Sequence, residues 1–137
     1  MANYIGGDVI EVVCSHPVLG TFRFSPKANE AFTLNKGGIR NNDDTNGVTG
    51  SGVASRQMNR QRWSLDGPIA VDMVSDNEFS GLDSLAASPI PGTWTLTTIS
   101  SAIYQGKGFP VGELNLDTNT AQQTLKIAGS GQLVKLP

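Results

Sequence analysis

The 137-residue chain is poor in cysteine, histidine and long apolar runs. Its one cysteine, Cys14, can form no disulfide within the chain, and no Asn-x-Ser/Thr sequence occurs, which is typical of a protein that folds in a reducing cytoplasm. No apolar run approaches the roughly 18 residues of a membrane-spanning helix, and residues 1–13 lack the basic start and apolar run of a signal peptide. We therefore expect a soluble protein that is neither exported nor anchored in a membrane.

Charge is also scarce. Only 16% of the residues are charged and the net charge is −2, so the overall balance does not favour binding to duplex nucleic acid or to an anionic membrane. Gly, Ser, Thr, Asn and Gln take the place of charged residues, which suits strands and turns better than surface helices. A chain of this length supports one core, and we expect a single domain over residues 1–137.

Alternating apolar and polar residues predict strands along most of the chain. Residues 8–14 and 18–25 form a predicted hairpin, with Phe22 and Phe24 on the face opposite Arg23. Trp63 is predicted to enter the core from a long strand that starts near residue 55. Further strands are expected at 30–34, 93–105, 109–116 and 121–136, with turns at the glycines of 106–108 and at 117–120, and Leu114, Leu116, Leu125 and Ile127 facing inward.

One helix is predicted between residues 75 and 92. Ser75 or Asp76 can cap its start, and Glu78 lies in the favourable first turn. Phe79, Leu82, Leu85 and Ala86 follow the helical repeat, and the prolines at 89 and 91 end it. One helix with about eight or nine strands predicts an α+β or mainly-β sandwich.

The segment 33–63 is polar, glycine-rich and far longer than the usual connection of about 4–6 residues. Predicted strands lie on both sides, and neither side alone has enough apolar residues for a core, so the segment is an excursion from one domain. Arg40 opens it, Asp43 and Asp44 stand at its centre, and three arginines close it: Arg56, Arg60 and Arg62. Two interpretations stay open: a solvated strand edge kept soluble by charge, or an interface where arginines pair with a neighbour's carboxylates.

No pattern in the chain indicates catalysis. Residues 42–47 have the start of a calcium-loop spacing, but Val53 stands where the loop needs a carboxylate. Cys14 and His16 share one strand face without a third orienting group, so we interpret them as a corner histidine beside a buried thiol. The glycine-rich stretches do not lie between a strand and a helix as a phosphate loop does. We predict no enzyme, with no catalytic residue, metal or cofactor.

The order of four segments resembles the tail tube proteins of contractile-tailed bacteriophages. They are "GGIRNNDD" at 37–44, "RQMNRQRWSLDGPIAVDM" at 56–73, "AASPIPGTWTLTTISSAIYQGKGFPVGELNLD" after the helix, and "TLKIAGSGQLVKL" near the end. The resemblance covers the chain from about residue 5 and lies in the order, the length and the lone helix. It implies packed antiparallel sheets flanked by one α-helix, with a long extended loop, assembled as hexameric rings whose inner strands close into one barrel.

In such a tube, rings stack head to tail, and the loop of each copy reaches into the adjacent ring. The resemblance implies a structural protein of the virion, assembled in the host cytoplasm, with the tail sheath, baseplate and tail-terminator proteins as further partners. We expect the arm at about 37–62 to be unstructured in a free subunit and ordered against a neighbour. Its contact residues are predicted to be Gly37, Gly38, Arg40, Asn41, Asn42, Asp43, Asp44, Arg56, Arg60 and Arg62.

DNA is expected to pass through the lumen without specific binding. Lysines or arginines on the bore would neutralise phosphates, release counterions and hold the DNA, so a neutral or acidic lining is required. The candidates for that lining are Glu113, Asn115 and Asp117, on the non-leucine face of one predicted strand.

Two alternatives to a tube protein stay open. One is another phage tail, baseplate, terminator or head structural protein on a similar fold. The other is a β-sandwich carbohydrate-binding module with Trp63, Trp94 and Tyr104 as stacking platforms, although both tryptophans lie in alternating strands and are expected in the core.

Overall fold

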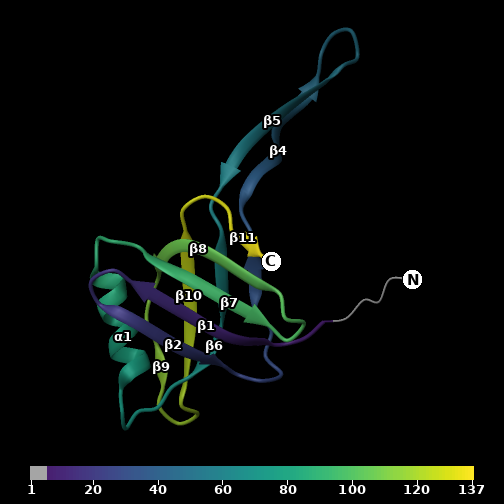
Figure 1. Cartoon of the computed structure of the whole chain (residues 1–137). Helices are drawn as coiled ribbons and strands as arrows, with labels where there is room; N and C mark the ends of the chain where they lie inside the picture. Colours follow the sequence, from purple (N-terminus) through teal and green to yellow (C-terminus); the bar gives the residue numbers. More distant parts are fainter. Residues whose placement is uncertain (1–5) are drawn as a thin grey trace.

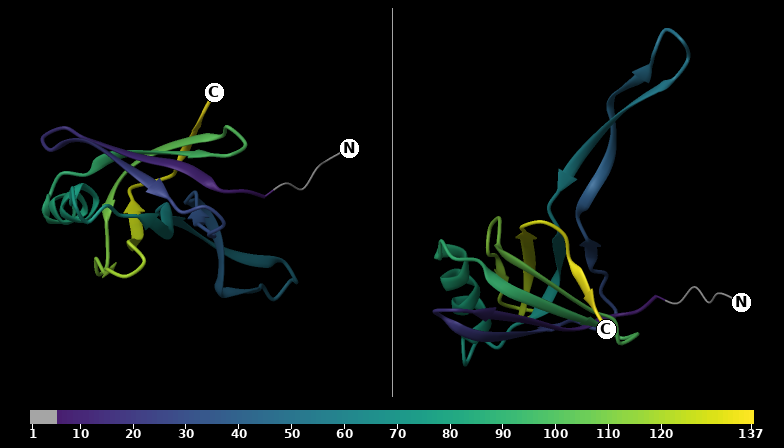
Figure 2. Two further views of the ribbon diagram at one scale, coloured as in Figure 1. Left: turned by 90° about the horizontal axis from the view of Figure 1, so that it is seen from below. Right: turned by 45° about the horizontal axis from the view of Figure 1, so that its top comes forward.

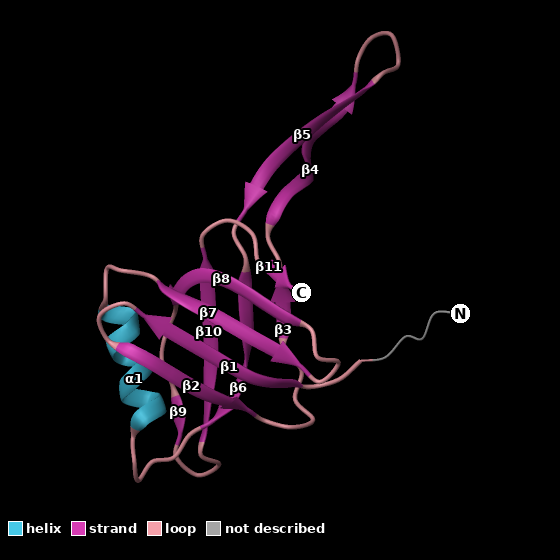
Figure 3. Cartoon of the chain, viewed as in Figure 1, coloured by secondary structure: helices cyan, strands magenta, loops and turns pink. Residues whose placement is uncertain are grey.

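The structure, a computed structural model, describes residues 6–137 except for the side chains of residues 43–46. Antiparallel strands dominate this part of the chain, with one helix beside them and one long hairpin that leaves the body (Figures 1 and 3). The predicted mainly-β class with a flanking helix is therefore confirmed. The elements are β1 (Val9–His16), β2 (Gly20–Pro26), β3 (Thr33–Asn35), β4 (Gly38–Val48), β5 (Ala54–Gln61), β6 (Ser64–Ala70), α1 (Asn77–Ala87), β7 (Gly92–Thr98), β8 (Ile103–Pro110), β9 (Leu116–Asp117), β10 (Gln122–Gly129) and β11 (Val134–Leu136).

The main sheet closes on itself. Its strands run in the order β8-β7-β1-β2-β6-β10, and β10 pairs back onto β8, which makes a six-stranded barrel (Figure 2). The closing seam pairs Ala128 with Phe109 and Gly129 with Gly108. The short strands β3, β9 and β11 extend β6, β10 and β8. Closure removes most of the open edges that a free sheet exposes to other chains.

Alternating side chains fill the barrel. On β10, Leu125 and Ile127 are buried while Thr124 and Lys126 face solvent. On β1 the alternation changes phase, because the register with β7 shifts between Val9 and Glu11. A bulge of this kind turns the following side chains to the opposite face. This bulge accounts for the imperfect alternation of apolar and polar residues along β1.

The predicted hairpin and helix pack against each other. Phe24 is buried and stacks on Trp94, with ring centroids 5.8 Å apart. Leu82 and Leu85 are buried and Phe79 is half-buried, as the helical repeat predicts, whereas Ala86 is exposed. Asp76 occupies the N-cap position, yet its carboxylate accepts the Ser80 hydroxyl at 2.6 Å and caps no backbone N–H. The helix ends at Ser88, ahead of the prolines.

The chain between 55 and 110 departs from the sequence prediction in two places. The predicted long strand breaks after Gln61, and β6 begins only after Trp63, which is fully buried. The turn predicted at 106–108 is wrong, because β8 runs straight through it and the chain reverses at 99–102, where Thr98 N–H donates to Ala102 C=O. The glycines of 106–108 are needed for space: a side chain on either would overlap the indole of Trp63.

Replacing Gly108 with alanine tests this packing. A Cβ there would lie 2.7 Å from Ala128 O and 2.8 Å from Trp63 Cζ2. Because overpacking a tight core costs about 1–3 kcal/mol, we expect Gly108→Ala to lower the free energy of unfolding by about that amount. Urea denaturation measures it. Gly50→Ala, at an open position with no atom within 4 Å of the new Cβ, is the matched control and should leave stability unchanged.

Gln123 is the one fully buried amide whose nitrogen and oxygen both lack a hydrogen-bond partner among residues 6–137. Leaving a buried polar group unsatisfied costs about 1–3 kcal/mol, so Gln123→Leu should raise the free energy of unfolding by a similar amount. Gln122→Leu, one residue along on the half-buried outer side, is the control and should change it by less than about 0.5 kcal/mol. A loss of stability in Gln123→Leu alone would contradict this interpretation.

Candidate functional site

The arm is the antiparallel hairpin of β4 and β5, and it projects from one end of the barrel (Figures 1 and 2). In the described chain β4 pairs only with β5, and neither strand joins the barrel sheet. The arm therefore lies where the sequence placed it. We expected an arm that is unstructured in a free subunit; instead its backbone groups pair across the hairpin and so satisfy their hydrogen bonds locally.

Glycines set the base of the arm. Gly37 and Gly38 have φ values of 74° and 99°, in the left-handed region that glycine tolerates best. A Cβ on Gly37 would lie 2.7 Å from Gln61 O and from Trp63 N. These two glycines turn the chain from β3 into β4, a role that the sequence prediction, which placed them in a contact with a neighbour, did not include.

The barrel holds both ends of the arm. Leu133 N–H donates to Lys36 C=O at 2.8 Å on the entering side, and Trp63 N–H donates to Gly131 C=O at 3.0 Å on the returning side. The loop before β11 thus clamps the two strands where they leave the barrel. These two backbone hydrogen bonds restrict how the arm can turn on its base.

The two sides of the arm differ in chemistry. Opposite residues share a face, and the register pairs Ile39 with Arg60 and Asn41 with Met58. Ile39 and Met58 on this side are 56% and 58% exposed. We call this side the apolar-arginine face: Ile39, Asn41, Arg56, Met58 and Arg60. The other side is formed mainly by amides and one arginine: Arg40, Asn42, Gln57, Asn59 and Gln61.

The arginines of the arm have no acidic partner among the described side chains, where the one ion pair joins Arg23 to Glu11 at 3.0 Å. Arg40 donates to its neighbour's carbonyl, Ile39 C=O, at 3.1 Å. Of the three arginines that close the segment, Arg56 and Arg60 lie on β5, whereas Arg62 lies between β5, which ends at Gln61, and β6. The side chains of Asp43 and Asp44 lie outside the described residues.

The tip of the arm closes on itself. Thr49 N–H donates to Val53 C=O at 2.8 Å, and Val53 N–H donates to the Thr49 hydroxyl at 3.0 Å. Gly52 N–H donates to Thr49 C=O at 2.9 Å. Val48 and Val53 flank this turn and are largely exposed. The tip is thus a defined turn with apolar side chains that nothing in the described chain covers.

The three lumen candidates do not share one strand face. The predicted strand 109–116 does not form, because residues 109–110 end β8 and β9 begins only at Leu116. Glu113 and Asn115 lie in the loop between these strands, and all three side chains are exposed. Asp117 shapes the following turn: its carboxylate accepts the N–H groups of Asn119 at 3.1 Å and Thr120 at 3.4 Å. These backbone hydrogen bonds, led by that of Asn119, lower the pKa of the Asp117 carboxyl.

His16 and Cys14 are structural, as predicted. His16 Nδ1 accepts the N–H groups of Val18 and Leu19, and Nε2 lies 2.9 Å from the Ile90 carbonyl oxygen, to which it donates. The ring thus joins the β1–β2 turn to the segment after α1. Cys14 is fully buried, and burial raises the pKa of its thiol to about 12. Sequence reasoning missed the Ile90 contact, since it joins residues 74 positions apart.

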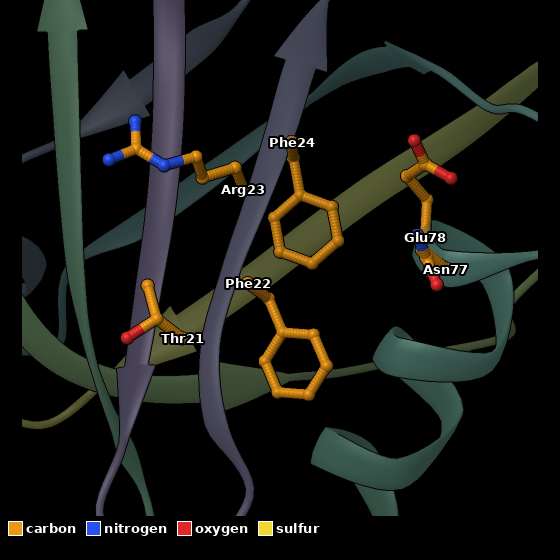
Figure 4. A pocket seen from close by; sticks show the side chains of 6 residues that line it. All are labelled: Thr21, Phe22, Arg23, Phe24, Asn77 and Glu78. Atoms are coloured by element: carbon orange, nitrogen blue, oxygen red, sulfur yellow. The ribbon is translucent and has the colours of Figure 1, made fainter. Parts of the chain in front are cut away.

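A groove lies between β2 and the first turn of α1 (Figure 4). It holds about 530 Å³. The rings of Phe22 and Phe24 point toward the helix, whereas Arg23 points to the other side of β2. The lining residues are Thr21, Phe22, Arg23, Phe24, Asn77 and Glu78.

We also searched the described residues for a metal site and for a membrane-spanning helix. Within 6–137, no group of three or more His, Cys, Asp or Glu side chains is placed to hold a metal ion. No helix in the same range is long and apolar enough to cross a membrane. Neither the models of protein families nor the curated proteins give a match to this sequence.

The buried thiol gives a direct test of the structural interpretation. The thiolate is the reactive form of cysteine, and a pKa of about 12 keeps Cys14 protonated at pH 8. We expect native protein to resist iodoacetamide at pH 8 and to be fully alkylated in 6 M guanidinium chloride, as read by intact mass. Rapid alkylation of the folded protein would show a reactive nucleophile instead.

Proposed function

We propose that this protein is a structural subunit of the tail tube of a contractile-tailed bacteriophage, which forms stacked hexameric rings around a channel for the genome. The observation that carries the proposal is the arm: a polar hairpin anchored at its base in the barrel core and extended away from its own molecule. The segment resemblance given above supplies the family.

An arm of this kind needs a partner. A two-stranded hairpin alone in water is marginally stable, and this one exposes Ile39, Met58, Val48 and Val53. Arginine and methionine are enriched at protein interfaces, and the two arginines of the apolar-arginine face pair with no described carboxylate. Contact with a neighbouring subunit would cover these side chains and offset the entropy of holding the arm extended.

An arm that projects from one end of a subunit favours the stacking of one subunit on the next. A contact between one end of a subunit and a different surface of the next is heterologous, and such contacts generate open filaments unless a rotation closes them. In the proposed tube the arms join successive rings. Within a ring, the outer edge of β11, which pairs only with β8 in the described chain, offers a site for strand pairing with a neighbour.

The charge balance suits a channel for DNA. The chain has twelve acidic and ten basic residues, so a bore formed from many copies need not hold phosphates through counterion release. Glu113, Asn115 and Asp117 are exposed and stay our candidates for its lining. We further propose that the sheath surrounds the tube and that baseplate and terminator proteins cap it, with assembly in the host cytoplasm.

The carbohydrate-binding alternative loses two of its three platforms. Trp63 and Trp94 are 0% and 1% exposed, and both indole N–H groups donate to backbone carbonyls of β8 at 2.9 Å. Neither ring is open to stack on a sugar. Another phage structural protein on the same fold remains the competing function, and electron microscopy of the purified protein separates the two: uniform hollow tubes indicate a tube protein, whereas closed oligomers of fixed size indicate a terminator, baseplate or head component.

Deletion of residues 41–55 with a short turn in their place tests the role of the arm. The deletion keeps the clamp at Lys36, Gly37 and Trp63, so the free energy of unfolding should stay within about 0.5 kcal/mol of the intact chain. Tube formation should be lost. Urea denaturation and negative-stain microscopy of the same preparation give the two readouts. A variant that no longer folds would place the arm in the core, and one that still forms tubes would remove the arm from the mechanism.

A further inference from the structure

We propose that the apolar-arginine face of the arm docks on one specific surface of a second copy, the start of helix α1. We call this receptor the helix-start surface: Phe22, Asp72, Met73, Val74, Asp76 and Glu78. The inference rests on the proposed function, and it identifies the surface of the neighbouring subunit that receives the arm.

The helix-start surface has an apolar part that nothing in the described chain covers. Val74 is 96% exposed and Met73 is 49% exposed, on the loop that leads from β6 into α1. The groove between β2 and the helix, with the ring of Phe22 against it, is lined by Glu78, whose carboxylate accepts the Asp72 N–H of the same loop (Figure 4). Adjacent exposed apolar side chains next to a groove are typical of a protein interaction site.

The charge of this surface is opposite to that of the arm. No lysine or arginine occurs from Trp63 to Gly106, while Asp72, Asp76 and Glu78 lie at the start of the helix. Glu78 and Asp72 are close together, since Asp72 N–H approaches Glu78 Oε2 at 3.4 Å. The one basic residue along the groove, Arg23, is already paired with Glu11. The acidic groups are thus available to cations from another molecule.

The arm presents the complementary pattern. Met58 stands between Arg56 and Arg60 on β5, with Ile39 opposite Arg60 across the hairpin. An apolar centre flanked by two arginines matches an apolar pair flanked by carboxylates. Burying Met58 and Ile39 against Met73 and Val74 removes apolar surface from water and so stabilises the contact. The opposite charges select this surface and the orientation of the arm on it.

The two surfaces lie at opposite ends of the molecule. The arm leaves the barrel at the top of Figure 1, and the chain enters α1 at the bottom, beyond the barrel; the turned views in Figure 2 keep the arm and the helix apart. One chain therefore cannot dock its arm on its own helix start. The same contact repeated from copy to copy is heterologous and extends without limit.

Paired cysteines test the contact directly. The only native thiol, Cys14, is buried with a pKa of about 12, so introduced surface cysteines react alone. We expect a chain with Met58→Cys and Val74→Cys to give a ladder of covalent oligomers with a short bismaleimide linker, because each copy joins the next. The linker tolerates a gap that the strict geometry of a disulfide does not. Denaturing electrophoresis reads the ladder.

Control variants test whether the ladder arises from the proposed contact. Each single variant alone should stay monomeric, and an equal mixture of the two should stop at a heterodimer. Met58→Cys combined with Ser100→Cys, an exposed position in the turn between β7 and β8, should give no ladder. Dimers from Met58→Cys alone, or a ladder of equal yield from the Ser100 pair, would overturn the assigned receptor.

Charge reversal provides a second measurement. Arg60→Glu should raise the protein concentration needed for assembly by at least about tenfold, and Glu78→Arg should do the same, because either places like charges together. Mixing the two variants should restore assembly with the two kinds of copy alternating, because both contacts between unlike copies place opposite charges together. Unchanged assembly in both single variants would overturn the inference.

The inference and the proposed function can fail separately. Hollow tubes in the microscope without the 58–74 ladder would leave the tube proposal in place and move the receptor elsewhere. A ladder from a protein that forms only solid or open fibrils would keep the docking contact and reject the tube.

Discussion

The structure depends on the burial of Trp63. Its indole fills the seam where β8 and β10 close the barrel, and glycines at 106, 108 and 129 leave the space that the ring occupies. The backbone of Trp63 is bonded on both sides, to Gly131 C=O and from Gly129 N–H, and its indole N–H donates to Lys107 C=O. The same residue is the point at which the arm returns to the barrel. The indole of Trp63 packs in the barrel seam and its backbone holds the returning strand of the arm, so one residue links the closed barrel to the projecting hairpin.

This arrangement separates two tasks within a small chain. The apolar residues are concentrated in the barrel and on one side of α1, where they form a single core. The arm forms its backbone hydrogen bonds within the hairpin and contributes almost nothing to that core. Core packing therefore does not restrict its side chains, which can suit contact with another molecule. A polar composition that looks unfavourable for folding is thus the composition expected of a surface that meets a partner only after the subunit has folded.

Sequence reasoning succeeded where the signals are local. The Phe22 and Phe24 face, the helix with Leu82 and Leu85, and the buried tryptophans all follow from alternation, helical repeat and flanking prolines. It failed where the cause lies far along the chain. The glycines of 106–108 indicate a turn unless one knows that an indole from position 63 needs their space. The two faces of the arm could not be assigned either, since they depend on which residue of β4 opposes Met58.

The pairing of Asn41 with Met58 restricts how the arm can vary. Successive side chains of a strand point to opposite sides, so one residue added or removed between the barrel and Met58 would turn the whole apolar-arginine face around. Changes of two residues in each strand would preserve it and alter only the reach, by about 7 Å per step. Related chains that keep this architecture should therefore differ in arm length by even increments in each strand, and the reach of the arm should change in the same discrete steps.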